Sequence, residues 1–316
     1  MQQYMINHIT LLLFIGLAWG QSKMDINNLI DRGGLLYATN DDEPYTGLVF
    51  EFYDNGQKRL NGRYNNGIKN GKWTWWNMDG SMDSTGTYKN DLMNGLWKYY
   101  YQNGQIHGQG RYIDGDGGNV SKSSGVPRNG RVGKWTFYYE NGQKKDEKTY
   151  KIGELDGFYT KWYENGKKSE RGTYRHGIKV GKWIQWYENG QKKVEYPNKD
   201  GKSDGLWTSW YENGQKSSEG ALKDGEYFLS NSWDKNGEMM VKDGNGNWTQ
   251  WYENGQKKVE YPYKDGKSDG IWTSWYENGQ KQYDVTFKSG GKISQNCWYE
   301  DGNKCECSEN WWEGCK

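Results

Sequence analysis

Trp186–Lys216 reads WYENGQKKVEYPNKDGKSDGLWTSWYENGQK, and Trp251–Lys281 repeats it with only two changes, Asn198 to Tyr263 and Leu206 to Ile271. This near-identity is the clearest part of a longer pattern. A unit of the form G-K-W-T-x-W-Y-E-N-G-Q-K-K, followed by a polar run and a second turn, recurs through most of the chain. A fixed period of this size predicts an array built from one small structural module.

The repeating unit begins at a glycine, and most successive starts are separated by the same interval, as from Gly47 to Gly71. The starts are Gly47, Gly71, Gly95, Gly133, Gly157, Gly181, Gly205, Gly225, Gly246, Gly270 and Gly291. The step from Gly95 to Gly133 is longer, because it contains an insertion at about 114–131 that is rich in Gly, Ser and Asn. Such a composition predicts a surface loop. The units at Gly225 and Gly291 look degenerate.

Each unit reads as a β-hairpin. Trp183–Tyr187 is aromatic and β-prone. Asn189-Gly190 follows, and Asn-Gly between such runs predicts a type I′ hairpin turn, in which both central residues take positive φ. The return strand is polar with one aromatic near its end, as at Tyr64, Tyr88, Tyr112, Tyr150 and Tyr174. We therefore expect an all-β fold: an elongated, single-sheet array of stacked antiparallel β-hairpins.

The core of such an array has to be aromatic. The chain has few aliphatic residues but contains 19 Trp and 26 Tyr, each of which can bury a large apolar area. Strand alternation places Trp183 and Tyr187 on one face and Trp186 on the other. The candidate aromatic residues are Trp183, Trp186, Trp207, Trp210, Trp248, Trp251, Trp272 and Trp275. We interpret them mainly as core, with contact to a ligand such as a sugar ring or a quaternary ammonium group as the alternative at some positions.

The segment 1–20 resembles a signal peptide. Leu11–Trp19 is a short apolar run, and a small-residue pattern ending at Gly20 precedes Gln21. The run is too short to span a bilayer. No Lys or Arg precedes it, which leaves an uncleaved anchor or a cytosolic start as alternatives. We expect an exported protein that is periplasmic, on the cell surface or secreted, and that has no transmembrane span after cleavage.

The remaining chain divides into an array and two ends. Residues 21–46 are expected to form a lead-in and cap, 47–290 the hairpin repeats, and 291–316 a degenerate last repeat and a Cys-rich cap. Arrays of this kind need atypical ends that block edge pairing of strands.

All four cysteines, Cys297, Cys305, Cys307 and Cys315, are crowded near the end of the sequence. An even count in a chain with an export signal predicts two disulfides. A Cys305–Cys307 bond would close a very tight ring, so we expect Cys297 to pair with one of these two residues and Cys315 with the other. Zinc binding is the rival interpretation, but the usual pair of C-x2–4-C motifs is absent.

Motifs of catalytic chemistry occur only inside the repeat. Gly201–Gly205 fits G-x-S-x-G, and Gly266–Gly270 fits it again. A hydrolase needs a helix after this motif and a histidine partner, and the only histidines are His8, His107 and His176. We therefore interpret the motif as a turn between repeats and expect no enzyme activity, no catalytic residues and no cofactor.

Metal and nucleic-acid binding are disfavoured as well. Asp114, Asp116 and Asn119 could ligate calcium, but the remaining positions of a calcium loop are missing, which favours a flexible loop. The net charge of +1 is far from the concentrated basic field that binds nucleic acid.

The unit G-x-W-x-x-[WY]-[YF]-x-N-G-x-x-K, followed by a Y-x-x-G-x-x-x-G stretch at Tyr64–Gly71, resembles the MORN (membrane occupation and recognition nexus) repeat. It is more similar to the bacterial variant found in YwqK-type antitoxin proteins. The lead-in Leu29–Gly47 of this chain is also similar to the entry segment of those proteins. The resemblance covers about Gly47–Gly302. It implies scaffolding, protein binding or, in the eukaryotic branch, lipid binding, and it supplies no catalytic residues.

Three functions remain open from the sequence. The first is a non-enzymatic exported protein that presents an extended surface to a protein or envelope partner. The second is a cell-surface module that binds carbohydrate or choline, because aromatic-acidic-Asn-Gly strings also resemble glucan- and choline-binding repeats. The third is a toxin-neutralising protein, as the antitoxin resemblance implies, although a secretion signal fits a cytosolic antitoxin poorly.

Overall fold

The computed structural model describes residues 22–223, 226–310 and 313–316. The predicted signal peptide, the repeat start Gly225 and residues 311–312 of the expected Cys-rich cap lie outside the described residues. None of the described segments is a helix long and apolar enough to cross a membrane.

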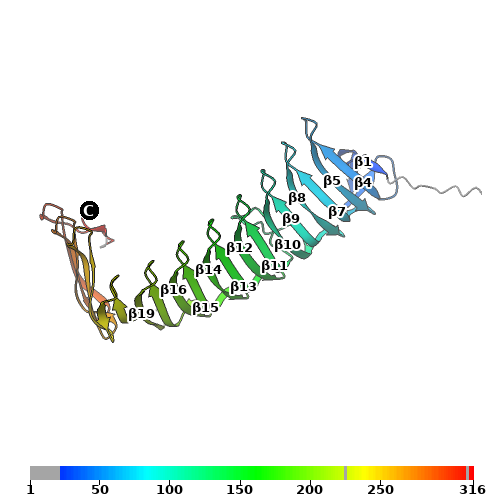
Figure 1. Cartoon of the computed structure of the whole chain (residues 1–316). Coiled ribbons are helices and arrows are strands. Elements are labelled where there is room, and N and C mark those ends of the chain that lie inside the picture. Colours follow the sequence, from blue (N-terminus) through cyan, green and yellow to red (C-terminus); the bar gives the residue numbers. More distant parts are fainter. Residues whose placement is uncertain (1–21, 224–225, 311–312) are drawn as a thin grey trace, which may run out of the picture.

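Within these residues, 26 strands form one sheet, and a two-stranded sheet lies beside it. Consecutive strands of the large sheet pair antiparallel, hairpin after hairpin in a single row (Figure 1). The predicted all-β array of stacked hairpins is therefore confirmed. Figure 1 also shows that the row turns sharply near β19 (Lys216–Lys223).

Each hairpin consists of a first strand and a return strand. The first strands are β4 (Gly47–Phe52), β7 (Gly71–Trp76), β9 (Leu92–Tyr100), β11 (Arg131–Tyr138), β13 (Glu154–Trp162), β15 (Ile178–Trp186), β18 (Gly205–Trp210), β20 (Glu226–Trp233), β22 (Asn245–Trp251), β25 (Gly270–Trp275) and β27 (Gly291–Trp298). The return strands are β5 (Lys58–Asn65), β8 (Met82–Lys89), β10 (Ile106–Gly115), β12 (Lys144–Lys151), β14 (Lys168–Arg175), β16 (Lys192–Lys199), β19, β21 (Met239–Lys242), β23 (Lys257–Lys264), β26 (Lys281–Lys288) and β28 (Lys304–Cys305). Short strands β6 (Ile68–Lys69), β17 (Lys202–Ser203) and β24 (Lys267–Ser268) precede β7, β18 and β25.

The Asn-Gly turn inside each hairpin differs from the sequence-based prediction. At Tyr187–Gln191 the chain forms a five-residue loop, in which the Tyr187 amide donates to the Gln191 carbonyl at 2.9 Å. Gly190 has a φ of 91°, whereas Asn189 is not among the residues with positive φ. The Asn189 side chain instead accepts a hydrogen bond from the Gln191 amide at 2.9 Å. The predicted type I′ turn is therefore wrong here, because a longer loop needs positive φ only at its glycine. We call this loop the wide turn.

Two-residue turns with positive φ at both positions occur at the opposite edge, between one hairpin and the next. His176 and Gly177 have φ values of 48° and 73°, and Asp200 and Gly201 have 50° and 82°. These values are those of a type I′ turn. Glycine meets this demand without steric cost, which explains why Gly recurs at the second position. We call these the tight turns.

One face of the sheet, the aromatic face, carries the core. The Trp97 ring lies flat on Gly86 of the preceding strand, and a Cβ atom added to Gly86 would fall 2.0 Å from the ring. The Trp97 Nε1 donates to the Thr87 carbonyl at 3.1 Å. The rings of Trp97 and Tyr88 meet edge to face, with their centroids 5.2 Å apart. The Gly-x-Tyr of one return strand thus forms a seat for the Trp of the next strand.

The same seat occurs along the array, with exceptions. Trp73, Trp135 and Trp183 lie in the same way on Gly62, Gly110 and Gly172. In several other return strands the glycine position is occupied by a larger residue, namely Lys148, Tyr196, Tyr261 or Val285. Where Lys148 replaces the glycine, the next strand carries Tyr159 in place of Trp.

The insertion after β10 is more buried than its composition predicts. Val126 is 1% exposed, and Ser121 is also buried. Arg131 is 1% exposed; its guanidinium donates to the Val126 and Pro127 carbonyls and to the Tyr150 hydroxyl. The prediction of a surface loop is therefore wrong for these residues, because Arg131 supplies donors that satisfy the buried loop carbonyls.

Distinct structures close the two ends of the array. At the start, β1 (Lys23–Asp25) pairs in parallel with β4. The 3-10 helix η1 (Ile26–Asn28), β2 (Leu29–Arg32) and β3 (Leu35–Ala38) follow it. At the other end, disulfides join Cys297 to Cys307 and Cys305 to Cys315. The two disulfides predicted from the cysteine count are present.

Candidate binding face

The face opposite the aromatic face, here called the open face, has no second layer of described residues over it (Figure 1). In each first strand, the residue that precedes the core residue of the aromatic face, such as Trp97, points to the open face, because side chains alternate along a strand. This residue is apolar and exposed in every second hairpin from the first to the seventh, and again in the tenth. These residues are Leu48, Leu96, Phe158, Leu206 and Ile271. Leu206 is 79% exposed, so the array presents apolar side chains to solvent repeatedly along its length.

Along the wide-turn edge, lysine ammonium groups cover tryptophan rings of the next hairpin. Lys192 Nζ lies 5.2 Å from the centre of the Trp210 ring. The equivalent pairs are Lys58–Trp76, Lys144–Trp162, Lys216–Trp233, Lys257–Trp275 and Lys281–Trp298. Each contact is a cation–π interaction that shields one ring face. Met239 occupies the lysine position before Trp251, which is 50% exposed.

The wide turns themselves are tied to one another. The Tyr163 hydroxyl donates to the Trp186 carbonyl at 2.6 Å, and Asn165 Nδ2 donates to the Glu188 carbonyl at 3.0 Å. The same pair of bonds recurs in most hairpins, and Tyr101 makes its bond to the Tyr138 carbonyl across the insertion. The repeated Tyr and Asn of the unit thus fix the spacing of hairpins and hold the open face in register.

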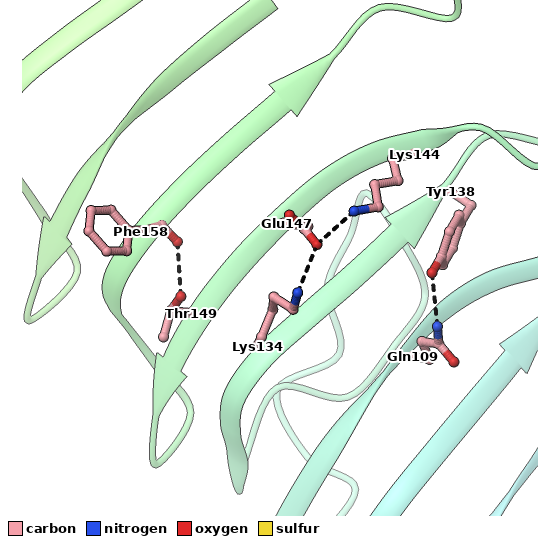
Figure 2. Close-up of polar contacts among 7 residues, drawn as sticks. All are labelled: Gln109, Lys134, Tyr138, Lys144, Glu147, Thr149 and Phe158. Carbon is pink, nitrogen blue, oxygen red and sulfur yellow. Dashed lines mark hydrogen bonds and ion pairs between the residues drawn. The ribbon is translucent and has the colours of Figure 1, made fainter. Parts of the chain in front are cut away.

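In most hairpins from β11 onward, an acidic side chain in the middle of the open face pairs with lysine, although Arg171 takes the acid's position on β14. Figure 2 shows the first of these acids. Glu147 on β12 accepts a hydrogen bond from Lys144 at 3.1 Å and lies 3.2 Å from Lys134 Nζ on β11. Burial acts to raise the pKa of Glu147, but the hydrogen bonds from the two lysines outweigh it and lower that pKa. Equivalent acids pair with lysines at Glu195, Glu219, Glu260 and Asp284.

The first three hairpins lack this acidic column. Asn61, Thr85 and Gln109 occupy the positions that correspond to Glu147. Arg63, Lys72, Lys98 and Arg111 lie on the same part of the open face. None of these four bases forms an ion pair with a residue that the structure describes. This part of the face is therefore basic and uncompensated. Among its neighbours are the apolar side chains of Met82, Leu96, Tyr100 and Ile106.

Two hollows of the open face occupy equivalent places. The first, of about 340 Å³, lies over β7, β8 and β9, and the second, of about 360 Å³, over β11 to β14. Their shared lining is a lysine, threonines and an exposed apolar residue: Lys72, Thr87 and Leu96 in the first, Lys134, Thr149 and Phe158 in the second. They differ at two facing positions in the centre. Thr85 and Lys98 in the first hollow correspond to Glu147 and Thr160 in the second.

The eight candidate tryptophans divide between the faces. Trp183 and Trp207 are buried on the aromatic face, and Trp248 and Trp272 are half-buried there. Trp186, Trp210 and Trp275 are half-buried at the edge of the open face, and Trp251 is exposed there. The structure therefore places no single site at these residues; they belong to two repeating rows.

The motifs that suggested chemistry have structural surroundings. Gly201 belongs to a tight turn, and Lys202–Ser203 is the short strand β17, so no helix follows the G-x-S-x-G motif. The Asp116 carboxylate accepts hydrogen bonds from the Gly118 amide and from Asn129, within the insertion. Among the described residues, no three His, Cys, Asp or Glu side chains form a cluster that could hold a metal ion.

Sequence reasoning missed two features of the faces. The Gly-x-Tyr seat was not noticed, although Gly86 and Tyr88 stand at fixed distance before Trp97. The second feature is that Thr85 occupies, in its hairpin, the position that the acid Glu147 occupies in another. Both become visible when the repeats are written under one another, column by column, because each column then has a constant structural environment.

Comparison with known proteins agrees with this repeat. The MORN repeat variant model matches six segments, at 93–114, 131–151, 179–199, 203–224, 244–265 and 268–289. Each segment coincides with one hairpin, and together they make up less than half of the chain. No curated protein matches the sequence. A chain in the crystal structure of TcdB2-TccC3-Cdc42 is similar with 11% identity and a TM-score of 0.18; the match covers 85% of this chain and 16% of that one. So weak a likeness says nothing about function.

Proposed function

We propose that this chain is a non-catalytic, exported repeat protein whose open face binds a protein partner. The observation that carries the proposal is the repeated exposure of apolar side chains on an uncovered sheet face, from Leu48 to Ile271. Exposed apolar residues rimmed by polar groups are typical of interaction surfaces. The MORN repeat variants in the chain support a binding role.

The open face suits a macromolecule better than a small ligand. Its hollows are shallow and spread along the array, and most of the edge tryptophans are already covered by lysines. A pocket for a small molecule is usually concave and encloses most of its ligand. An elongated surface with repeated contacts instead matches the extended binding surfaces of repeat proteins.

Two disulfides support the exported location, because disulfides persist in oxidising compartments. The toxin-neutralising alternative places the protein in the cytosol, where thiols stay reduced, and the disulfides favour export over it.

The test uses two lysine substitutions of matched exposure. Leu206→Lys alters the open face, whereas Ile152→Lys alters a tight turn away from that face; the two side chains are 79% and 76% exposed. Crosslinking of the full chain in envelope extracts, followed by mass spectrometry, should recover a partner with the wild type and with Ile152→Lys, but not with Leu206→Lys. Equal recovery by both variants, or no crosslink to the open face of the wild type, would refute the proposal.

A further inference from the structure

We infer that the open face over β7, β8 and β9 binds a carboxylate of an acidic and apolar protein segment. In this complex, a partner's Glu or Asp side chain takes the place that Glu147 occupies in the equivalent hollow of the array. The inference rests on the proposed function and specifies the chemistry of the partner.

The repeat itself shows where the carboxylate goes. Strand register makes the two hollows equivalent: Lys72 pairs with Thr87 and Thr74 with Thr85, just as Lys134 pairs with Thr149 and Thr136 with Glu147. The second hollow therefore displays a carboxylate already bound in this geometry. Glu147 lies there between Lys134 and Lys144 (Figure 2). In the first hollow, the shorter side chain of Thr85 leaves that space open.

The first hollow keeps one of the two lysines that hold Glu147 and has a different second base. Lys72 corresponds to Lys134, whereas Met82 replaces Lys144 and Lys98 stands where the second hollow has Thr160. Lys98 lies directly opposite Thr85 in the strand register, and Lys72 lies on the neighbouring position of the other flanking strand. Both lysines line the hollow. Neither forms an ion pair within the described part of the chain. A carboxylate entering beside Thr85 would receive charge-assisted hydrogen bonds from both ammonium groups, and such bonds are stronger than neutral ones.

The side chains around the hollow favour a partner segment that carries apolar residues next to its acidic one. Met82, Leu96 and Tyr100 line the same space, and Leu96 is 49% exposed. In the ion-paired hairpins, lysines stand in the column of Met82, as Lys144 does. The apolar replacement removes a charge and adds a surface that can be buried. A protein segment that alternates acidic and apolar side chains matches both features, whereas a nucleic-acid backbone would leave Leu96 and Met82 uncovered.

The experiment exchanges the central residues of the two hollows. Thr85→Glu supplies an internal carboxylate to Lys72 and Lys98, and Glu147→Thr removes the internal carboxylate from Lys134 and Lys144. The probe is a fluorescein-labelled peptide of alternating Glu and Leu, titrated against the full chain by fluorescence anisotropy. We expect Thr85→Glu to weaken binding about tenfold or more, which corresponds to ~1.4 kcal/mol. We expect Glu147→Thr to strengthen it by adding a second site. A peptide of alternating Lys and Leu should not bind.

Three outcomes would overturn the inference. The first is equal affinity of Thr85→Glu and the wild type for the Glu-Leu peptide, with both proteins folded by circular dichroism. The second is no binding of the peptide to the wild type. The third is tighter binding of duplex DNA or of anionic lipid vesicles that Thr85→Glu abolishes, because the hollow would then be a phosphate site. If, in any of these cases, the wild type still crosslinks to a partner and Leu206→Lys does not, the proposed function stands without this site.

Discussion

The two faces of the sheet follow different rules although they share every strand. On the aromatic face, Trp97 on Gly86 and Trp135 on Gly110 repeat one packing arrangement, which varies in the hairpins where a larger residue replaces the glycine. On the open face, the equivalent columns change from hairpin to hairpin, from Thr85 to Glu147 and from Leu96 to Lys134. A face that must pack tolerates little variation, since volume changes in a core are costly. A solvent-exposed face tolerates more variation, which is consistent with the binding role that we propose for the open face.

The largest expected effect comes from filling a glycine seat. Gly86→Ala places a methyl group 2.0 Å from the Trp97 ring, against a side chain that is 2% exposed. Overpacking of this kind costs about 1–3 kcal/mol. We expect urea unfolding, followed by tryptophan fluorescence, to show a clear loss of stability. Lys148→Ala is the matched control, because the same column already holds a side chain there and Tyr159 follows it. A smaller loss of stability in Gly86→Ala than in the control would contradict the close packing of Trp97 on Gly86.

A smaller effect is expected where the hairpins are tied at their wide turns. Tyr163→Phe removes the hydroxyl that donates to the Trp186 carbonyl. The loss of one such hydrogen bond costs about 1 kcal/mol. Tyr299→Phe is the matched control: it changes the last wide turn, after which no further hairpin follows among the described residues. Equal stability of the two variants in urea would argue against the tie between neighbouring turns.

The smallest effect is expected on the open face. Burial acts to raise the pKa of Glu195, but the hydrogen bonds that it accepts from Lys182 and Lys192 outweigh burial and lower that pKa. A pKa that is lower in the folded state stabilises the fold above the unfolded value, near 4.5, and this contribution is lost as pH falls through the folded value. Glu195→Gln should therefore cost roughly 0.2–1 kcal/mol at neutral pH.

The pH dependence separates this ion pair from a packing effect. At a pH well below both pKa values, Glu195 is protonated in both states, so wild type and Glu195→Gln should unfold at nearly the same urea concentration. An undiminished difference at low pH would show that the substitution acts through the shape of the side chain.

The sequence predicts the backbone of this protein better than its surface. Period and aromatic composition were enough for the hairpin array, because Trp183 and its counterparts recur at fixed spacing. The turns were misassigned, since Asn189-Gly190 can form either a two-residue or a longer loop, and strand pairing decides between them. The buried part of the insertion depends on Arg131 reaching loop carbonyls, which spacing along the chain does not reveal. Similarly, the open hollow at Thr85 appears only when strand register places Lys98 opposite it.

The near-duplicate segments Trp186–Lys216 and Trp251–Lys281 occupy equivalent places in the sheet. Each runs from the end of one first strand, through its return strand and the next first strand, to the start of the following return strand. Nearly all of the strand pairing joins neighbours in sequence. A chain with such low contact order can nucleate in any hairpin and grow outward, as linear repeat arrays do. Copying a block of hairpins therefore lengthens the molecule without creating a new topology. We expect hydrogen exchange to show protection that fades from the interior toward both termini, and a single uniform rate along the array would exclude this mode of growth.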